Sequence, residues 1–200
     1  MRAKVLPVIV IAAVLVLPAA AARAQEISLD DRTIVVGERV GPIEKGMTLF
    51  GLKTLVGGGK VKPAKIPGAE GEELDGAKMF AGTEHEIDIL FNPEGDEKEI
   101  LEIQVIGKGW QFSNGLKLGA SVAEVEKING KAFKLMGFNW DYGGYANLEG
   151  GKLGGKVSLR FDPGTAEVPA SLSGDREIAS TDKKLRALNP KVQHISVFLR

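Results

Sequence analysis

Residues 43–57 read IEKGMTLFGLKTLVG, and residues 116–130 read LKLGASVAEVEKING. Aligned without a gap, the two stretches share a glycine, a hydroxyl residue two positions later, a row of apolar residues and a closing glycine. The matched pairs are Gly46 with Gly119, Thr48 with Ser121, Leu49 with Val122, Leu52 with Val125, Leu55 with Ile128 and Gly57 with Gly130. Internal similarity of this kind determines the fold, so the sequence predicts two copies of one unit.

Each stretch predicts a short helix. Thr48 and Ser121 are suitable N-caps, because a hydroxyl can accept a hydrogen bond from a free N–H of the first turn. Glu124 lies three residues after Ser121, which is the spacing of a capping box. A glycine ends each apolar stripe, as is common at helix C-termini. A helix of about two turns needs packing to hold it, so each one must lie on other elements.

The strands that follow the helices also repeat. Residues 86–91 and 156–161 both alternate apolar and polar side chains, which is typical of a half-buried strand. Residues 99–106 and 192–199 have the same alternation and predict a partner strand for each. The interval from the closing glycine to the end of the first strand is also similar in the two copies. We therefore expect one antiparallel hairpin per copy.

These patterns predict an α+β fold of two tandem units, each a short helix packed on an antiparallel sheet. The first unit spans residues 25–112, and the second spans residues 113–200 with an insertion at 164–190 inside its hairpin. Residues 180–188 of the insertion predict one helix, which would end before Pro190. Residues 60–76 carry two prolines and three glycines and are interpreted as a loop. Further short strands are expected within 26–36, 77–81 and 132–138.

Residues 1–24 have the pattern of a signal peptide. Arg2 and Lys4 precede an apolar run, and Ala22-Arg23-Ala24 supplies small residues at the two positions that a signal peptidase reads. The alternative is a membrane anchor, but the run is shorter than the roughly 20 residues of a spanning helix. The sequence therefore predicts a periplasmic or secreted protein that is soluble after cleavage.

The composition excludes several classes of function. Removal of residues 1–24 leaves 23 basic and 26 acidic residues, so a nucleic-acid binder with a basic stripe is not expected. The chain has no cysteine, which excludes disulfides, cysteine catalysis and thiolate metal sites.

The order G-x-[ST], short capped helix, glycine and antiparallel strands resembles one known group, carried by Gly46-Met47-Thr48 and Gly119-Ala120-Ser121. It is similar to the β-lactamase-inhibitor-protein fold and to the BamE (SmpA/OmlA) outer-membrane lipoproteins. The resemblance implies a helical piece laid on an antiparallel sheet, with two such units in tandem in the inhibitor. The chain lacks the lipid-attachment cysteine of the BamE type and the disulfides of the inhibitor. No functional residue is carried over from either family.

The candidate binding residues cluster in residues 137–144, GFNWDYGG, and the tyrosine that follows. Both tyrosines and one of the two tryptophans lie here, and clustered Trp and Tyr are typical of binding hot spots. We expect residues 138, 140 and 142 to share one strand face. The alternative is that the rings fill the core between the two units. The candidate residues are Phe138, Asn139, Trp140, Asp141, Tyr142 and Tyr145.

Other candidates for chemistry are weaker. His85 should point away from the carboxylates of residues 84, 86 and 88, so we expect a solvated acidic strand face and no metal site. The sequence has no G-x-S-x-G motif, so His194 is not expected to belong to a Ser-His-Asp hydrolase site. Residues 150–157 nearly match a P-loop, but Val157 replaces the required Ser or Thr, and the segment is interpreted as a turn.

We therefore expect no cofactor and no metal. The leading hypothesis is an exported, non-catalytic binding module for a protein or cell-envelope partner. The alternative is a small envelope hydrolase or glycan-acting enzyme that uses Asp141 beside the aromatic cluster.

Overall fold

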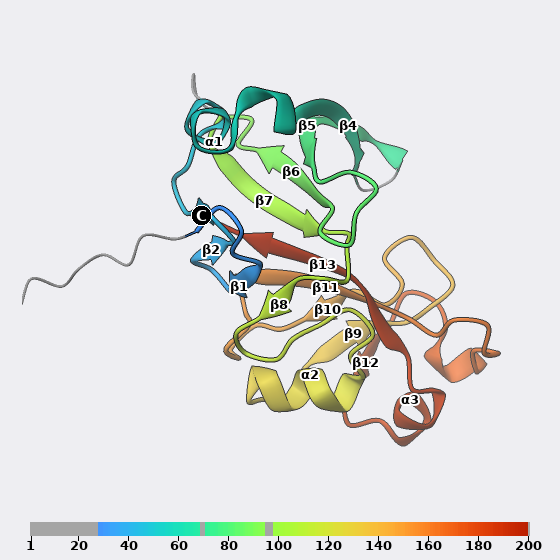
Figure 1. The fold of residues 1–200 in the computed structure, drawn as a ribbon. Helices are drawn as coiled ribbons and strands as arrows, with labels where there is room; N and C mark the ends of the chain where they lie inside the picture. Colours follow the sequence, from blue (N-terminus) through green and yellow to red (C-terminus); the bar gives the residue numbers. More distant parts are fainter. Residues whose placement is uncertain (1–27, 69–70, 95–97, 200) are drawn as a thin grey trace, which may run out of the picture.

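The fold is mixed α+β, as predicted (Figure 1). The computed structural model describes residues 28–68, 71–94 and 98–199, and the predicted signal peptide lies outside these ranges. The helices within them are α1 (Leu49–Val56), α2 (Val122–Asn129) and α3 (Lys183–Leu188), with 3-10 turns at Gly58–Lys60 and Ala170–Leu172. In this part of the chain no helix is long and apolar enough to cross a membrane.

The largest sheet is antiparallel and has the strand order β11-β13-β7-β6-β5-β4. Its strands are β4 (Lys62–Pro67), β5 (Glu73–Met79), β6 (Ile87–Phe91), β7 (Ile100–Val105), β11 (Val157–Asp162) and β13 (Lys191–Phe198). The two predicted hairpins, β6–β7 and β11–β13, are therefore present. They pair with each other through β7 and β13, so the middle of the sheet joins residues far apart in the sequence.

Two small sheets complete the fold. One has the order β3-β2-β1-β8 and the other the order β10-β9-β12. The strands of the first are β1 (Thr33–Val35), β2 (Arg39–Val40), β3 (Ile43–Glu44) and β8 (Gln111–Phe112). Those of the second are β9 (Lys134–Met136), β10 (Ala146–Asn147) and β12 (Glu177–Ala179). A single bridge between Tyr145 and Arg160 links the second small sheet to β11.

The predicted helix caps are confirmed. The Thr48 hydroxyl accepts a hydrogen bond from the Gly51 amide at 3.2 Å. Ser121 and Glu124 form the reciprocal capping box, and Gly130 takes the left-handed conformation at the end of α2. Leu52 and Val125 point from the two helices into one continuous core with the inner face of the large sheet. Packing therefore holds both short helices, as their length requires.

The two hairpins share details of pairing. Ile87 lies opposite Val105 and Ile89 opposite Ile103 in β6–β7, while Val157 lies opposite Val197 and Leu159 opposite Ile195 in β11–β13. A register shift follows at the same place in each hairpin. It falls between Leu90 and Phe91 and between Arg160 and Phe161. The unpaired extra residue lies in β7 in the first hairpin and in β13 in the second. A bulge bends its strand, so both inner strands bend at matching positions.

Two sequence-based predictions are wrong. Residues 60–76 contain β4 and the start of β5 instead of a loop. Pro63 and Pro67 are tolerated because β4 is the edge strand, where a missing N–H breaks no inner ladder. Residues 138–142 do not form a strand, because Asn139 has φ +64° and residues 139–144 form bends and turns. The helix of the insertion is shorter than predicted, since Asp182 caps it from residue 183 onward.

Candidate functional site

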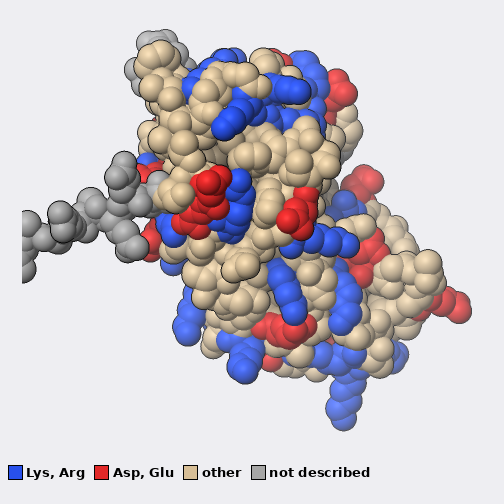
Figure 2. Space-filling view, in the orientation of Figure 1, with Lys and Arg blue, Asp and Glu red and all other residues tan. Residues whose placement is uncertain are grey.

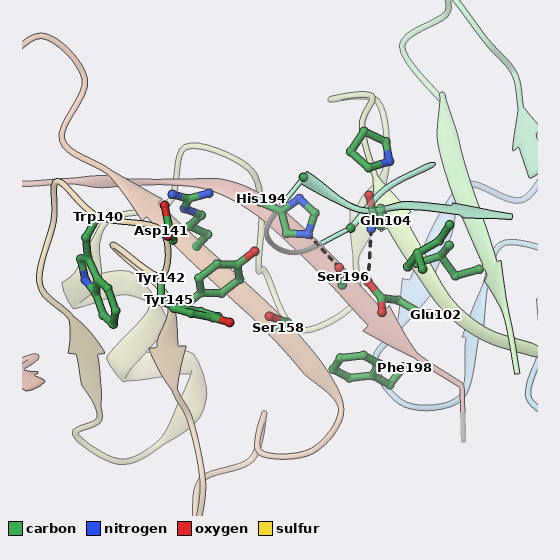
Figure 3. Close-up of a pocket in the computed structure, with 16 residues that line it drawn as sticks. Glu102, Gln104, Trp140, Asp141, Tyr142, Tyr145, Ser158, His194, Ser196 and Phe198 are labelled. Carbon is green, nitrogen blue, oxygen red and sulfur yellow. Dashed lines mark hydrogen bonds between the residues drawn. The ribbon is translucent and has the colours of Figure 1, made fainter. Parts of the chain in front are cut away.

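A depression of about 880 Å³ lies on the face of the large sheet opposite the helices; we call it the trough (Figure 3). Its floor is formed by Glu102, Gln104, Ser158, Arg160, His194, Ser196 and Phe198 of β7, β11 and β13. One end, the aromatic end, is formed by Trp140, Asp141, Tyr142 and Tyr145. The other, the apolar end, is formed by Pro67, Gly68, Gly71, Leu74 and Leu90.

Strand register places polar side chains in a row on this face of the sheet, and the row crosses the floor. Asp88 pairs with Gln104, Gln104 pairs with Ser196, and Ser196 pairs with Ser158. Directly paired residues point to the same face of a sheet, so the row runs across four strands. The opposite face of the same strands carries the core residues Ile89, Ile103 and Ile195. Alternation along each strand thus separates the trough from the core.

His194 and Ser196 form a hydrogen-bonded pair on the floor. His194 Nε2 lies 2.8 Å from Ser196 Oγ, and Ser196 is buried. Burial lowers the pKa of His194, and Arg160 lowers it further, against the opposing effect of Glu102. The ring is therefore neutral at neutral pH. In the described ranges no carboxylate hydrogen-bonds His194, so the pair lacks the orienting acid of a hydrolase triad.

Arg160 is held in place from two sides. Its Nε–H donates a hydrogen bond to the Gly143 carbonyl at 2.9 Å. Its guanidinium carbon lies 5.3 Å from the centre of the Tyr145 ring, within cation–π range. Both contacts come from the turn that precedes β10, and they tie this turn to β11.

The predicted aromatic residues divide between the core and the trough. Phe138 is 3% exposed and belongs to the core, and the Asn139 side chain donates to Ser173 Oγ at 3.1 Å outside the trough lining. Trp140 is half-buried, and its Nε1–H donates to the Gly137 carbonyl at 2.8 Å. Tyr142 is 41% exposed and meets the Trp140 ring edge-on at 5.4 Å. The structure thus places Trp140, Asp141, Tyr142 and Tyr145 together in the lining.

The acidic face of β6 differs from the prediction. Asp88 is 3% exposed instead of solvated, because the Lys78 ammonium bonds both of its carboxylate oxygens at 2.6 and 2.8 Å. His85 lies in the preceding turn and packs edge-on against Trp110, with ring centres 5.8 Å apart. Within the described residues no group of three or more His, Asp or Glu side chains could hold a metal ion.

Sequence reasoning missed most of the floor. Single polar residues such as Gln104, Ser158 and Ser196 alternate with apolar ones in each strand, as on any outward sheet face. The pairing of β7 with β13 brings these residues together. The two aligned hairpins in the sequence did not specify that pairing.

Comparisons with known proteins give a weak structural likeness. No family model and no curated protein matches the sequence. Among solved structures, the uncharacterized protein yfeY from Escherichia coli aligns with 83% of this chain and 99% of its own, at 16% identity and a TM-score of 0.46.

Proposed function

We propose that the protein is a non-catalytic binding module and that the trough receives a segment of a protein partner. The observation that carries this proposal is the trough itself. It combines an exposed aromatic residue, Tyr142, with a floor of hydrogen-bonding side chains and an apolar end. Such a combination of aromatic anchors with fixed polar groups is typical of recognition sites.

The charge distribution favours a protein partner over nucleic acid. Acidic and basic side chains are interspersed over much of the visible face in Figure 2. The trough lining contains Glu102 and Asp141 but one basic residue of the Lys or Arg type, Arg160. A nucleic-acid site would need several cations for the phosphates.

We further propose that the chain is an exported protein built from two tandem units. The export proposal rests on the signal-like residues 1–24. The tandem proposal is supported by the matching caps, hairpin registers and bulges. It is also supported by two matching bridges, Thr48 with Glu99 and Ser121 with Lys191, which tie the start of each helix to the last strand of its hairpin. Failure of residues 47–105 to superpose on residues 120–197 would contradict it.

A second candidate is a glycan-acting hydrolase. Asp141 and Glu102 line the same trough, and such enzymes use two carboxylates. However, Figure 3 shows Tyr142, Tyr145 and His194 between them, with Asp141 at the aromatic end. Release of reducing sugar from cell-wall glycan, abolished by Asp141→Asn, would favour the enzyme over the binding module.

The binding proposal can be tested by capture from an envelope extract followed by mass spectrometry. Tyr142→Ala should reduce capture of the partner by about tenfold or more, as expected for a hot-spot residue. The melting temperature should change little, because Tyr142 lies outside the buried core cluster. Phe50→Ala is a matched control, since Phe50 is an exposed aromatic residue on α1, away from the trough lining. Equal capture by Tyr142→Ala and the native protein would contradict the proposal.

A further inference from the structure

The guanidinium of Arg160 is oriented but not neutralised. Its Nε–H donates a hydrogen bond to the Gly143 carbonyl, and the group lies over the Tyr145 ring. In the described ranges no carboxylate lies within ion-pair distance of Arg160, and no acceptor is bonded to its two terminal nitrogens. A guanidinium in this state offers a planar pair of donors that fits a carboxylate.

The glycines at 143 and 144 make this orientation possible. Gly144 has φ +81°, and a Cβ there would lie 2.0 Å from the Phe161 carbonyl oxygen. A Cβ on Gly143 would lie 2.9 Å from the Trp140 carbonyl oxygen. Only glycine lets the turn approach β11 closely enough for the Gly143 carbonyl to reach Arg160. The local fold thus fixes Arg160 before any ligand arrives, which reduces the entropy cost of binding.

We infer that Arg160 is the anion anchor of the trough, and that the partner is an extended protein segment that places one carboxylate on it. This inference rests on the proposed binding function and specifies its ligand. Among the lining residues Arg160 is the one Lys or Arg, while Glu102 and Asp141 line the same trough. The two acids repel a polyanion, such as an acidic polysaccharide, so the site favours a single Asp or Glu within an otherwise uncharged segment.

The apolar end specifies a second feature of the segment. Ile66 and Leu90 are buried on the trough side of the sheet, outside the main core cluster, and Leu74 beside them is 40% exposed. An apolar side chain of the partner can cover Leu74 there. Leu90 is on β6 and Arg160 on β11, three strand spacings apart. The register also places Leu90 level with residue 156, directly before β11 and four residues along the chain from Arg160. With about 4.8 Å between strands and about 3.3 Å per residue, the separation is about 19 Å, or about six residues of extended chain.

The segment should therefore carry an apolar residue and an acid about six positions apart. Selection of phage-displayed random dodecapeptides on the immobilised protein tests this. The enriched peptides are expected to contain that spacing. A selected peptide synthesised with Gln or Asn in place of its acid should bind about tenfold more weakly or worse, as measured by calorimetry. This comparison requires no change to the protein.

Protein variants provide the second arm. Arg160→Gln should lower the affinity for the selected peptide by about tenfold. Arg160→Lys keeps the charge but loses the planar pair of donors, so its affinity should lie between those of the native protein and Arg160→Gln. Arg176→Gln is the matched control, because Arg176 is exposed and outside the trough. Circular dichroism checks that each variant is folded.

Three results would overturn the inference: no enrichment, enriched peptides without an acid, or equal binding of the acid and amide peptides. Tight binding of heparin or polyglutamate that competes with the peptide would also overturn it, because the site would then accept polyanions. Failure of the inference is distinguishable from failure of the proposed function. If Tyr142→Ala still abolishes capture of the natural partner, the trough binds protein without using a carboxylate.

Discussion

Gln104 on β7 lies directly opposite Ser196 on β13, at the middle of the large sheet. The neighbouring pairs are Ile103 with Val197 and Glu102 with Phe198. In the proposed duplication Gln104 and Ser196 occupy equivalent positions, as residues on a local twofold axis would. The floor of the trough is centred on this pair. Its chemistry is nevertheless asymmetric, because Glu102 in one unit corresponds to His194 in the other. A ligand therefore has one preferred direction across the sheet.

Asp88 should be the most sensitive charged residue of the sheet. Asp88→Ala leaves the Lys78 ammonium without its main partner. Burial opposes the charge on Lys78, but hydrogen bonds and charge from Asp88, with Glu86, raise the pKa of this lysine. Breaking a buried pair typically costs 3–5 kcal/mol, and partial exposure of Lys78 reduces this to about 2–4 kcal/mol. Urea unfolding measures the loss. Asp75→Asn is the matched control, because the Lys65–Asp75 pair on β4 and β5 is exposed; an equal loss in both variants would contradict the prediction.

His194 should make the native protein less stable in acid. Its pKa in the folded chain lies below the ordinary 6.5, chiefly through burial. As the pH falls below about 6.5 the unfolded chain binds a proton that the folded chain does not, so the free energy of unfolding decreases until the folded pKa is passed. His194→Gln removes this contribution. The difference in melting temperature between variant and native protein should therefore change between pH 7 and pH 5. A constant difference over this range would show that His194 does not titrate differently in the two states.

The elements that sequence predicted well are those with local signals. The caps at Thr48 and Ser121 and the alternation in β6 and β11 need no knowledge of distant residues. Strand β4 was missed because its two prolines are acceptable only at an edge, and its edge position is a property of the whole sheet. Likewise, the pairing of β7 with β13 creates the trough, and no local pattern specifies a contact between residues about 90 positions apart.

The aromatic segment shows the same limit. Four of the six residues singled out by type line the trough. The predicted strand was wrong because Asn139 adopts a left-handed conformation that alternation does not reveal. Gly144 is the residue on which the segment depends most.

Gly144→Ala should detach the aromatic turn from β11. The added Cβ would meet the Phe161 carbonyl at 2.0 Å, and the backbone has φ +81°. Strain of this kind costs about 1–3 kcal/mol, with a lower melting temperature and shifted amide signals at residues 143–145 and 160–161 in NMR spectra. Gly58→Ala is the control, because no atom lies within 4 Å of a Cβ there and φ is not positive. Unchanged signals at Arg160 in the Gly144 variant would contradict the role assigned to the turn.

Ser180 should stabilise the insertion more than its size suggests. Its Oγ accepts a hydrogen bond from the Phe133 amide at 3.0 Å and donates one to Glu126, which also binds Arg186 at 2.8 Å. Ser180 is fully buried, so Ser180→Ala leaves the Phe133 N–H without its partner at a cost of about 1–3 kcal/mol. The urea midpoint should fall while the slope stays constant, and exchange of the Phe133 amide hydrogen should accelerate. Thr181→Ala, at the exposed neighbouring position, should change neither. If Phe133 exchange is equally slow in both variants, the insertion is held by its apolar contacts, through Leu185 and Ile178, and not by this polar link.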